Sequence, residues 1–334
     1  MSQHKRSSRA PRVSHNTRLA KISVLVADRD ARTASLINTV LRSFGFMQID
    51  LVTEPAKALE AMARKPYGLI ITEWHLAEED GIALVKAIRG PLRHPLMRRD
   101  IPVIMLTAKS DVQSVKVARD AGITEFLAKP FTAHTLSHRL IQVIDHPRLF
   151  VEAEGYTGPC RRRRGEPPPG EGERRGVRKP VDELPPNFAL REMLGVPASD
   201  IFTEELIRTA QEELQKQEPV FISWANDDIL QLEGAFRAML ANPGDSNARE
   251  LLLRTAYAIK SQAGMFGYDL GTQIARNLID YMEKHERIEG EQFTILRKHI
   301  DTMAVIFHQK IKQTGQELGA ELVASLHKLI EKLG

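Results

Sequence analysis

The 334-residue sequence predicts an α/β doubly wound domain with a five-stranded parallel sheet, followed by an all-α helical bundle. Two observations support this prediction. In the first half, short apolar runs alternate with helical patterns, and each run ends in polar or charged residues. After residue 186, apolar residues recur at spacings of three and four between clear stops, which is typical of packed amphipathic helices.

The first domain contains four apolar segments that we expect to be buried strands. They are Ile22–Ala27, Gly68–Thr72, Val103–Leu106 and Glu125–Ala128. The polar residues near their carboxyl ends are Asp28, Glu73, Thr107 and Lys129. Open parallel sheets bind ligands outside the carboxyl ends of their strands. These four side chains are therefore expected to line one pocket, which we call the strand-end pocket.

The order and spacing of these residues resemble the receiver domain of two-component response regulators, from about Ile22 to Ile144. The segment Tyr67–Leu76 is similar to chemotaxis-type regulators in particular. The resemblance implies a flavodoxin-like fold. It also implies a phosphoryl-accepting Asp at the position of Glu73 and Mg²⁺-binding acids at those of Asp28 and Arg29. The resemblance further implies that Thr107 and Lys129 contact the phosphoryl oxygens. It also implies that the aromatic residue at the position of Phe126 reports the state of the domain.

Two departures from the receiver pattern put phosphorylation in doubt. The acceptor position holds Glu73, whose extra methylene displaces the nucleophile, and a misplacement of ~1 Å can cost roughly 10²-fold in rate. The second acidic position holds Arg29, which has no acceptor atom and stays charged. Asp30 is expected to point to the other side of the strand end. We therefore expect no bound cofactor, with Mg²⁺ held at most weakly through Asp28.

The second half is expected to form six helices joined by short connections. Their predicted ranges are 203–217, 219–240, 246–265, 269–286, 291–313 and 316–333. The third contains Leu253–Gly267, which resembles the motif of histidine phosphotransfer (HPt) domains, with Tyr257 at the histidine position. A phenol with a pKa of about 10 cannot replace a phosphorylatable imidazole. The resemblance implies a face that docks receiver domains, the docking face, formed by Tyr257, Lys260, Ser261 and Gly264.

The composition suggests four segments along the chain. Residues 1–20 are expected to be a disordered basic arm, and residues 21–148 the receiver-like domain. Residues 149–187, rich in Pro, Gly and Arg, read as a flexible to semi-extended linker. Residues 188–334 are expected to form the HPt-like helical domain.

Composition also restricts the class of protein. The single cysteine, Cys160, permits no internal disulfide and suggests a reducing cytoplasm. No apolar run approaches the roughly 18 residues that span a membrane. Apart from the basic arm, nothing suggests nucleic-acid binding, because no helix-turn-helix with a basic recognition helix is visible.

Both phosphoryl-carrying positions are thus altered, Asp to Glu and His to Tyr. The main interpretation is a cytoplasmic, non-enzymatic signalling adaptor that docks a histidine kinase, a response regulator or a phosphotransfer protein. The alternative is a working response regulator, phosphorylated on Glu73 or Asp28, with the helical domain as its output. A nucleic-acid regulator ranks third, and homo-oligomerisation is left open. Glu73 either imitates a phosphoryl group by reaching Lys129 and Thr107, or pairs with Arg29 in an inactive state.

Overall fold

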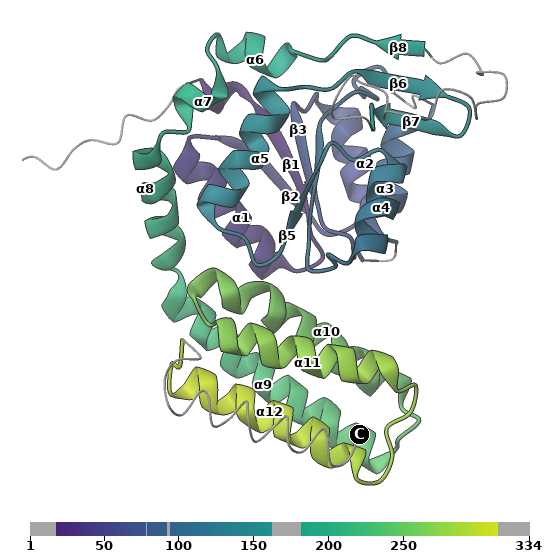
Figure 1. Ribbon diagram of the computed structural model, residues 1–334, viewed down its shortest axis with the longest axis vertical. Helices are drawn as coiled ribbons and strands as arrows, with labels where there is room; N and C mark the ends of the chain where they lie inside the picture. Colours follow the sequence, from purple (N-terminus) through teal and green to yellow (C-terminus); the bar gives the residue numbers. More distant parts are fainter. Residues whose placement is uncertain (1–17, 78, 92–93, 162–181, 313–334) are drawn as a thin grey trace, which may run out of the picture.

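A computed structural model describes residues 18–77, 79–91, 94–161 and 182–312. Two bodies make up this part of the chain, a sheet domain above and a helical bundle below in Figure 1. The predicted doubly wound parallel sheet and the predicted all-α bundle are both confirmed. Nothing is described for residues 1–17 of the basic arm, for the Arg- and Pro-rich residues 162–181, or for the sixth predicted helix at 316–333.

The sheet domain alternates strands and helices. Its elements are β1 (Ser23–Ala27), α1 (Ala31–Phe44), β2 (Gln48–Val52), α2 (Pro55–Arg64), β3 (Leu69–Thr72), α3 (Gly81–Arg89), β4 (Val103–Thr107), α4 (Val112–Ala121), β5 (Glu125–Ala128) and α5 (Ala133–Asp145). The strands are all parallel, in the order β2-β1-β3-β4-β5. The central strands are buried on both faces, as their continuous apolar runs require. Helices α1 and α5 cover one face and α2, α3 and α4 the other (Figure 1).

Aspartates begin several of the helices that follow the strands. Asp30 caps α1, Asp80 caps α3 and Asp111 caps α4, each accepting a hydrogen bond from a backbone amide of the first turn. These caps fix the loops at the carboxyl edge of the sheet. They therefore help to position the side chains of the strand-end pocket.

The segment predicted as a linker is partly ordered. An antiparallel hairpin of β6 (Phe150–Ala153) and β7 (Tyr156–Pro159) forms there, and β8 (Asp182–Leu184) pairs with β6. Arg99 holds the hairpin to the sheet domain through an ion pair with Glu152, at 3.0 Å. The expectation of an unstructured segment is wrong for these residues.

Three helices before the bundle pack on the sheet domain. They are α6 (Ala189–Leu194), α7 (Ala198–Ile201) and α8 (Glu204–Gln215). The Asp145 carboxylate, at the end of α5, accepts hydrogen bonds from the backbone amides of Ala198 (2.7 Å) and Ser199 (2.9 Å). Helix α8 lies against α1 and α5. The predicted boundary at residue 188 is therefore displaced, because the change from sheet domain to bundle comes after α8.

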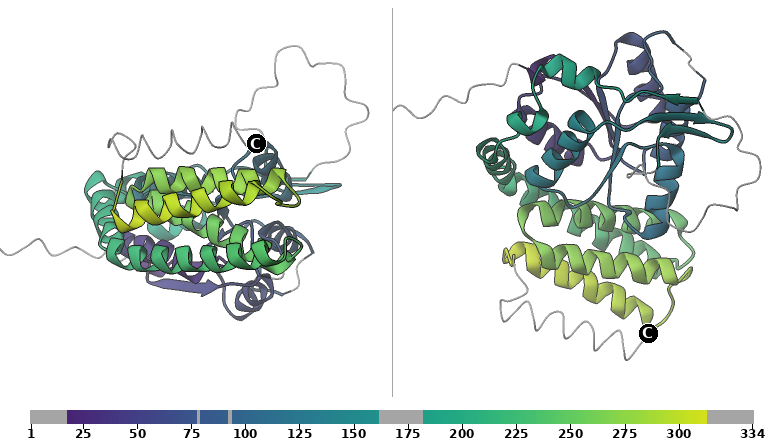
Figure 2. Two further views of the ribbon diagram at one scale, coloured as in Figure 1. Left: turned by 90° about the horizontal axis from the view of Figure 1, so that it is seen from below. Right: turned by 45° about the horizontal axis from the view of Figure 1, so that its top comes forward.

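Four helices form the bundle, α9 (Glu218–Ala241), α10 (Ser246–Ala263), α11 (Asp269–Lys284) and α12 (Gln292–His308). Each contacts the next in sequence, and α12 closes the bundle against α9 (Figure 2). An aromatic cluster fills one end of the core, where the Phe221 ring stacks on Phe266 at 4.7 Å and meets Phe307 edge-on at 5.8 Å. Helix α10 and its C-cap Gly264 carry the docking face, and α10 lies between the sheet domain and the rest of the bundle (Figure 1).

Candidate functional site

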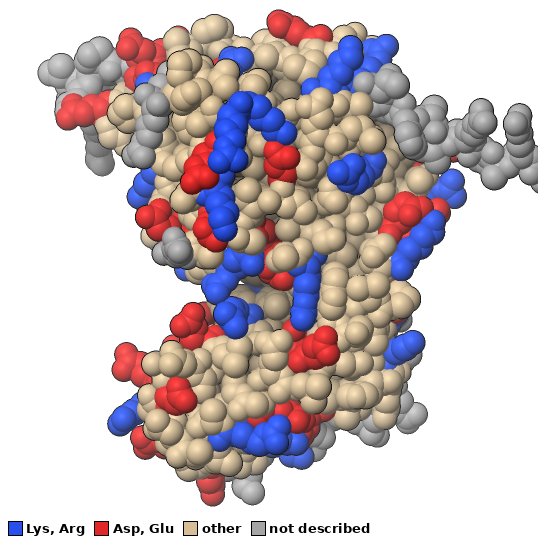
Figure 3. Space-filling view, turned by 180° about the vertical axis from the view of Figure 1, so that it is seen from behind, with Lys and Arg blue, Asp and Glu red and all other residues tan. Residues whose placement is uncertain are grey.

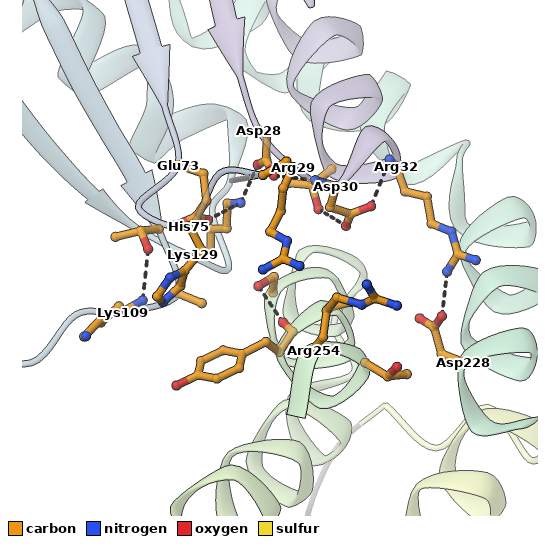
Figure 4. Close-up of a pocket in the computed structure, with 18 of the residues that line it drawn as sticks. Asp28, Arg29, Asp30, Arg32, Glu73, His75, Lys109, Lys129, Asp228 and Arg254 are labelled. Carbon is orange, nitrogen blue, oxygen red and sulfur yellow. Dashed lines mark hydrogen bonds and ion pairs between the residues drawn. The ribbon is translucent and has the colours of Figure 1, made fainter. Parts of the chain in front are cut away.

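The centre of the strand-end pocket is a buried lysine held by two carboxylates. Lys129 Nζ donates a hydrogen bond to Asp28 Oδ2 at 2.6 Å and lies 2.5 Å from Glu73 Oε2 (Figure 4). These three side chains come from the ends of β1, β3 and β5, and each is at most 7% exposed. The parallel sheet places the three ends at one edge, so the structure brings together residues up to 101 positions apart.

Burial and charge act against each other in this group. Burial raises the pKa of Asp28 to about 6, with the neighbouring Glu73 charge adding to the rise and Lys129 opposing it. Burial also opposes the charge on Lys129, but the two carboxylates outweigh it and raise the pKa of the ammonium. Lys129 therefore stays charged at neutral pH and balances one of the two carboxylate charges.

Glu73 has no free oxygen in this arrangement. Its Oε1 accepts a hydrogen bond from the backbone amide of Trp74 at 2.6 Å, and its Oε2 faces Lys129. Arg29 is exposed at the mouth of the strand-end pocket, and no ion pair joins it to Glu73. Of the two arrangements expected for Glu73, the pairing with Arg29 is therefore wrong, and the carboxylate reaches the lysine instead.

Thr107 and Phe126 occupy different surroundings. The buried Thr107 hydroxyl accepts a hydrogen bond from the Lys109 amide at 3.1 Å and lines the same cavity as Glu73. No hydrogen bond joins Thr107 to Glu73, both of which are described residues. Phe126 is half-buried and packs with the core beneath α2, α3 and α4. The structure therefore does not bring Phe126 to the strand-end pocket.

The docking face lies against the sheet domain of its own chain. Lys260 Nζ donates a hydrogen bond to the Ala108 carbonyl at 3.1 Å, just beyond the end of β4. Gly264 abuts Pro130, so closely that a Cβ at Gly264 would lie 2.4 Å from Pro130 Cγ. The HPt resemblance implies a face that is accessible to a separate receiver domain. That expectation is wrong for Lys260 and Gly264, because the sheet domain covers them.

The other two residues of the docking face are also engaged. The Tyr257 hydroxyl donates to Glu283 Oε1 at 2.7 Å, and its ring lies 6.3 Å from the His75 ring. Burial, followed by the Glu283 hydrogen bond and charge, raises the pKa of Tyr257. The buried Ser261 hydroxyl donates to the Tyr257 carbonyl at 2.7 Å. Tyr257 is half-buried and projects on the same side as Lys260, whose ammonium lies 5.4 Å from its ring centre.

Two further side chains of the bundle bind the sheet domain, and sequence reasoning did not identify either. Gln262 is fully buried, and its Nε2 donates to Asp30 Oδ2 at 2.5 Å. Asp228 of α9 forms an ion pair with Arg32 at 2.7 Å. Asp228 lies outside the quoted motifs, and Gln262 lies within the HPt-like segment Leu253–Gly267, where the resemblance assigns it no role. Their partners lie at least 196 positions away, so no local pattern marks them.

The comparisons with known proteins identify the sheet domain. Residues 24–141 match the family model described as "Response regulator receiver domain". Residues 24–141 form a response regulator receiver domain. Chemotaxis protein CheY-3 of Vibrio cholerae is 27% identical over 126 residues, which cover 37% of this chain and 92% of CheY-3. Transcriptional regulatory protein ZraR of Salmonella typhimurium is 30% identical over 128 residues, 38% of this chain but 27% of ZraR.

Solved receiver structures are also similar to a part of the chain. The receiver domain of the Pseudomonas aeruginosa sensor histidine kinase PA1611 is 27% identical, with a TM-score of 0.32, and covers 36% of this chain and 94% of its own. A putative response regulator from Chloroflexus aurantiacus is 29% identical, with a TM-score of 0.34. The match covers 37% of this chain and 98% of that protein.

The receiver resemblance implies Mg²⁺ near Glu73, but the residues present do not fit this ion. Asp28 and Glu73 are both committed to Lys129, and Arg29 stands where a second acid would be a ligand. Asp30 accepts hydrogen bonds from the Arg32 amide and from Gln262, so its carboxylate is also committed. Within the described residues, no three Asp, Glu, His or Cys side chains are grouped to hold a metal ion.

A cavity of about 460 Å³ lies between the strand-end pocket and the bundle. The edge of the strand-end pocket forms one wall and α9 and α10 form the other (Figure 4). From behind, a hollow is visible between the two bodies, and Lys and Arg side chains gather around it (Figure 3). None of the described helices is long and apolar enough to cross a membrane.

Proposed function

We propose that this chain is a two-component signalling adaptor whose receiver domain is not switched by phosphorylation. The observation that supports this most is the Glu73 carboxylate at 2.5 Å from Lys129. The receiver resemblance implies that the lysine at this position contacts the phosphoryl group. Here the ammonium of Lys129 is already bound to the Glu73 carboxylate. With a charge of −1, against about −1.5 to −2 for a phosphoryl group, Glu73 imitates the phosphorylated form only in part.

The charge of the strand-end pocket supports the same proposal. Phosphoryl transfer depends on cations that neutralise the developing negative charge, and Mg²⁺ is the main one in phosphoryl-transfer sites. Here Arg29 replaces a ligand for that ion, and Lys129 is already paired with Asp28 and Glu73. The nucleophile has lost the surroundings that would activate it. The chain is accordingly proposed to have no enzymatic activity of its own.

The proposed partners are proteins of the relay, namely a histidine kinase, a response regulator or a phosphotransfer protein. The docking face already contacts a receiver domain, its own, through Lys260 and Gly264. A partner receiver would therefore compete with the intramolecular contact. The adaptor would bind such a partner only in proportion to the population in which the two bodies separate.

Radiolabel transfer from acetyl phosphate in the presence of Mg²⁺ tests the proposal. We expect no label on the wild-type chain, little on Glu73→Asp, and clear labelling of the double variant Arg29→Asp/Glu73→Asp, which recreates the implied acid set. Arg64→Asp/Glu73→Asp is the matched control, because Arg64 is an exposed residue of α2 far from the strand-end pocket. Stoichiometric labelling of the wild-type chain would overturn the proposal.

One observation favours a second candidate, a working response regulator with the bundle as its output. Loops at the carboxyl edge of the receiver sheet touch the bundle through Asp30, Ala108 and Pro130. A charge change in the strand-end pocket would therefore act directly on α10. If wild-type protein takes up label, and Glu73→Gln or Asp28→Asn abolishes it, this candidate replaces the adaptor.

A further inference from the structure

The cavity between the receiver domain and the bundle contains more positive than negative side chains. Five of its lining residues are Lys or Arg and four are Asp or Glu. All four acids have donors of their own. Asp28 and Glu73 hold Lys129, Asp228 holds Arg32, and Asp30 caps α1 and binds Gln262.

Two guanidinium groups in this cavity have no such partner. Arg29 comes from the receiver domain and Arg254 from α10, and both side chains are exposed. Across the described part of the chain, neither has an ion pair or a hydrogen-bond acceptor. Figure 4 shows both side chains extending into the same cavity from its opposite walls. Like charges repel, and an anion bound between these two guanidinium groups would offset their repulsion.

Two more cationic or polar groups face the same cavity. Lys109 stacks over Trp74 at 5.1 Å, and His75 lies beside Tyr257. Both also line the cavity. Arg29, Arg254, Lys109 and His75 thus all border this cavity. An anion bound there would be distinct from a phosphoryl group on the acceptor position, since Glu73 and Asp28 enclose Lys129.

We propose that this cavity is a binding site for a small phosphorylated molecule, which Arg29 and Arg254 hold from opposite sides and which bridges the receiver domain and the bundle. Guanidinium groups bind phosphate oxygens in a bidentate, planar geometry, so two of them suit a diphosphate or a phosphate ester. A volume of about 460 Å³ is within the range of metabolite sites and too small for a folded partner.

Calorimetric titration with inorganic pyrophosphate tests the site, using the full chain in EDTA at constant ionic strength. We expect saturable binding to the wild-type protein. Arg29→Gln and Arg254→Gln should each weaken it at least tenfold. Arg237→Gln is the control, because Arg237 is an exposed residue of α9 outside the cavity. Unchanged affinity in both cavity variants, or no saturation of the wild type at millimolar pyrophosphate, would overturn the proposal.

A second variant tests the bridging itself. Arg254→Glu places a carboxylate opposite Arg29 and should substitute for the anion. We expect it to melt at a higher temperature than the wild type without pyrophosphate and to show no further shift when pyrophosphate is added. A pyrophosphate-dependent shift equal to that of the wild type would show that Arg254 does not bind the anion, and would overturn the bridging site.

ADP, titrated in parallel, identifies the source of the phosphate groups. Tighter binding of ADP than of pyrophosphate would assign the cavity to a nucleotide, because only ADP adds a base and a sugar. Tighter binding of pyrophosphate would assign it to a simpler phosphate compound. Either order supports the site, provided that Arg254→Gln weakens the tighter ligand.

Discussion

At the residue scale, the protein depends on a lysine buried between two acids. A buried ion pair gains little stability over apolar packing, but losing one partner leaves an uncompensated charge. At Lys129 the imbalance would be severe, because Asp28 and Glu73 both face it and lie almost completely out of solvent. The stability of the folded protein therefore depends on a lysine at position 129.

Lys129→Ala is expected to lower the free energy of unfolding by about 3–5 kcal/mol at pH 7. Urea unfolding followed by circular dichroism measures this. The loss should shrink at pH 5. Burial raises the pKa of Asp28 to about 6, and removing Lys129 would raise it further. A folded protein with such a raised carboxyl pKa becomes more stable as the pH falls through that pKa, because the folded state then binds the proton more tightly than the unfolded state. Lys216→Ala, at an exposed pair with Glu213, is the control. An equal loss in both variants would contradict the role of burial.

At the element scale, the end of α10 is shaped to fit the receiver domain. Gly264 has an ordinary helical backbone, with φ −67° and ψ −20°, so its conformation does not require glycine. The requirement comes from Pro130, whose ring leaves no room for a Cβ. Gly264 lies one turn beyond Lys260, which binds the Ala108 carbonyl. The two contacts together fix how α10 meets the carboxyl edge of the sheet.

Gly264→Ala is therefore expected to force α10 away from Pro130 and loosen the contact between the two bodies. Gly234→Ala is the matched control, since a Cβ there meets nothing within 4 Å in the middle of α9. The control should gain roughly 0.5–1 kcal/mol from helix propensity. Small-angle X-ray scattering should show a larger radius of gyration for Gly264→Ala alone. A compact Gly264→Ala protein with unchanged amide exchange in α10 would refute the tight contact.

At the scale of the whole molecule, the receiver domain and the bundle share one continuous apolar core. It runs from α1 and α5 through α8 into α9 to α12. Polar contacts also fix the orientation of the two bodies relative to each other. They include the Arg32–Asp228 ion pair at 2.7 Å, whose carboxylate is buried. The two bodies are therefore held in one arrangement by complementary charge as well as by apolar area.

Reversal of the Arg32–Asp228 pair tests that arrangement. Arg32→Asp and Asp228→Arg should each bring like charges together and speed amide exchange in the segments between the two bodies. The double variant restores opposite charges and should recover at least half of the protection. Hydrogen-exchange mass spectrometry at pH 7 measures both effects. If the double variant exchanges as fast as the sum of the single variants predicts, the two residues do not interact.

The sequence by itself determined the parts of this protein that follow from local pattern. Buried parallel strands need apolar runs, and their carboxyl ends meet at one edge, so Asp28, Glu73 and Lys129 could be placed near one another without coordinates. The spacing of apolar residues likewise predicted α8 to α12 close to their observed limits. The hairpin of β6 and β7 was missed, because Pro, Gly and charged residues obscured its pairing.

Only the tertiary structure decided how these parts meet. Lys260 binds a carbonyl 152 positions away, and Gln262 binds Asp30 across 232, so no local pattern encodes either contact. The partner of Glu73 was also a matter of geometry. Two cations, Arg29 and Lys129, were available from the sequence. The end of β5 brings Lys129 within 2.5 Å of the carboxylate, while Arg29 extends into the cavity. Residue types set which bonds are available, and the packing of distant elements selects among them.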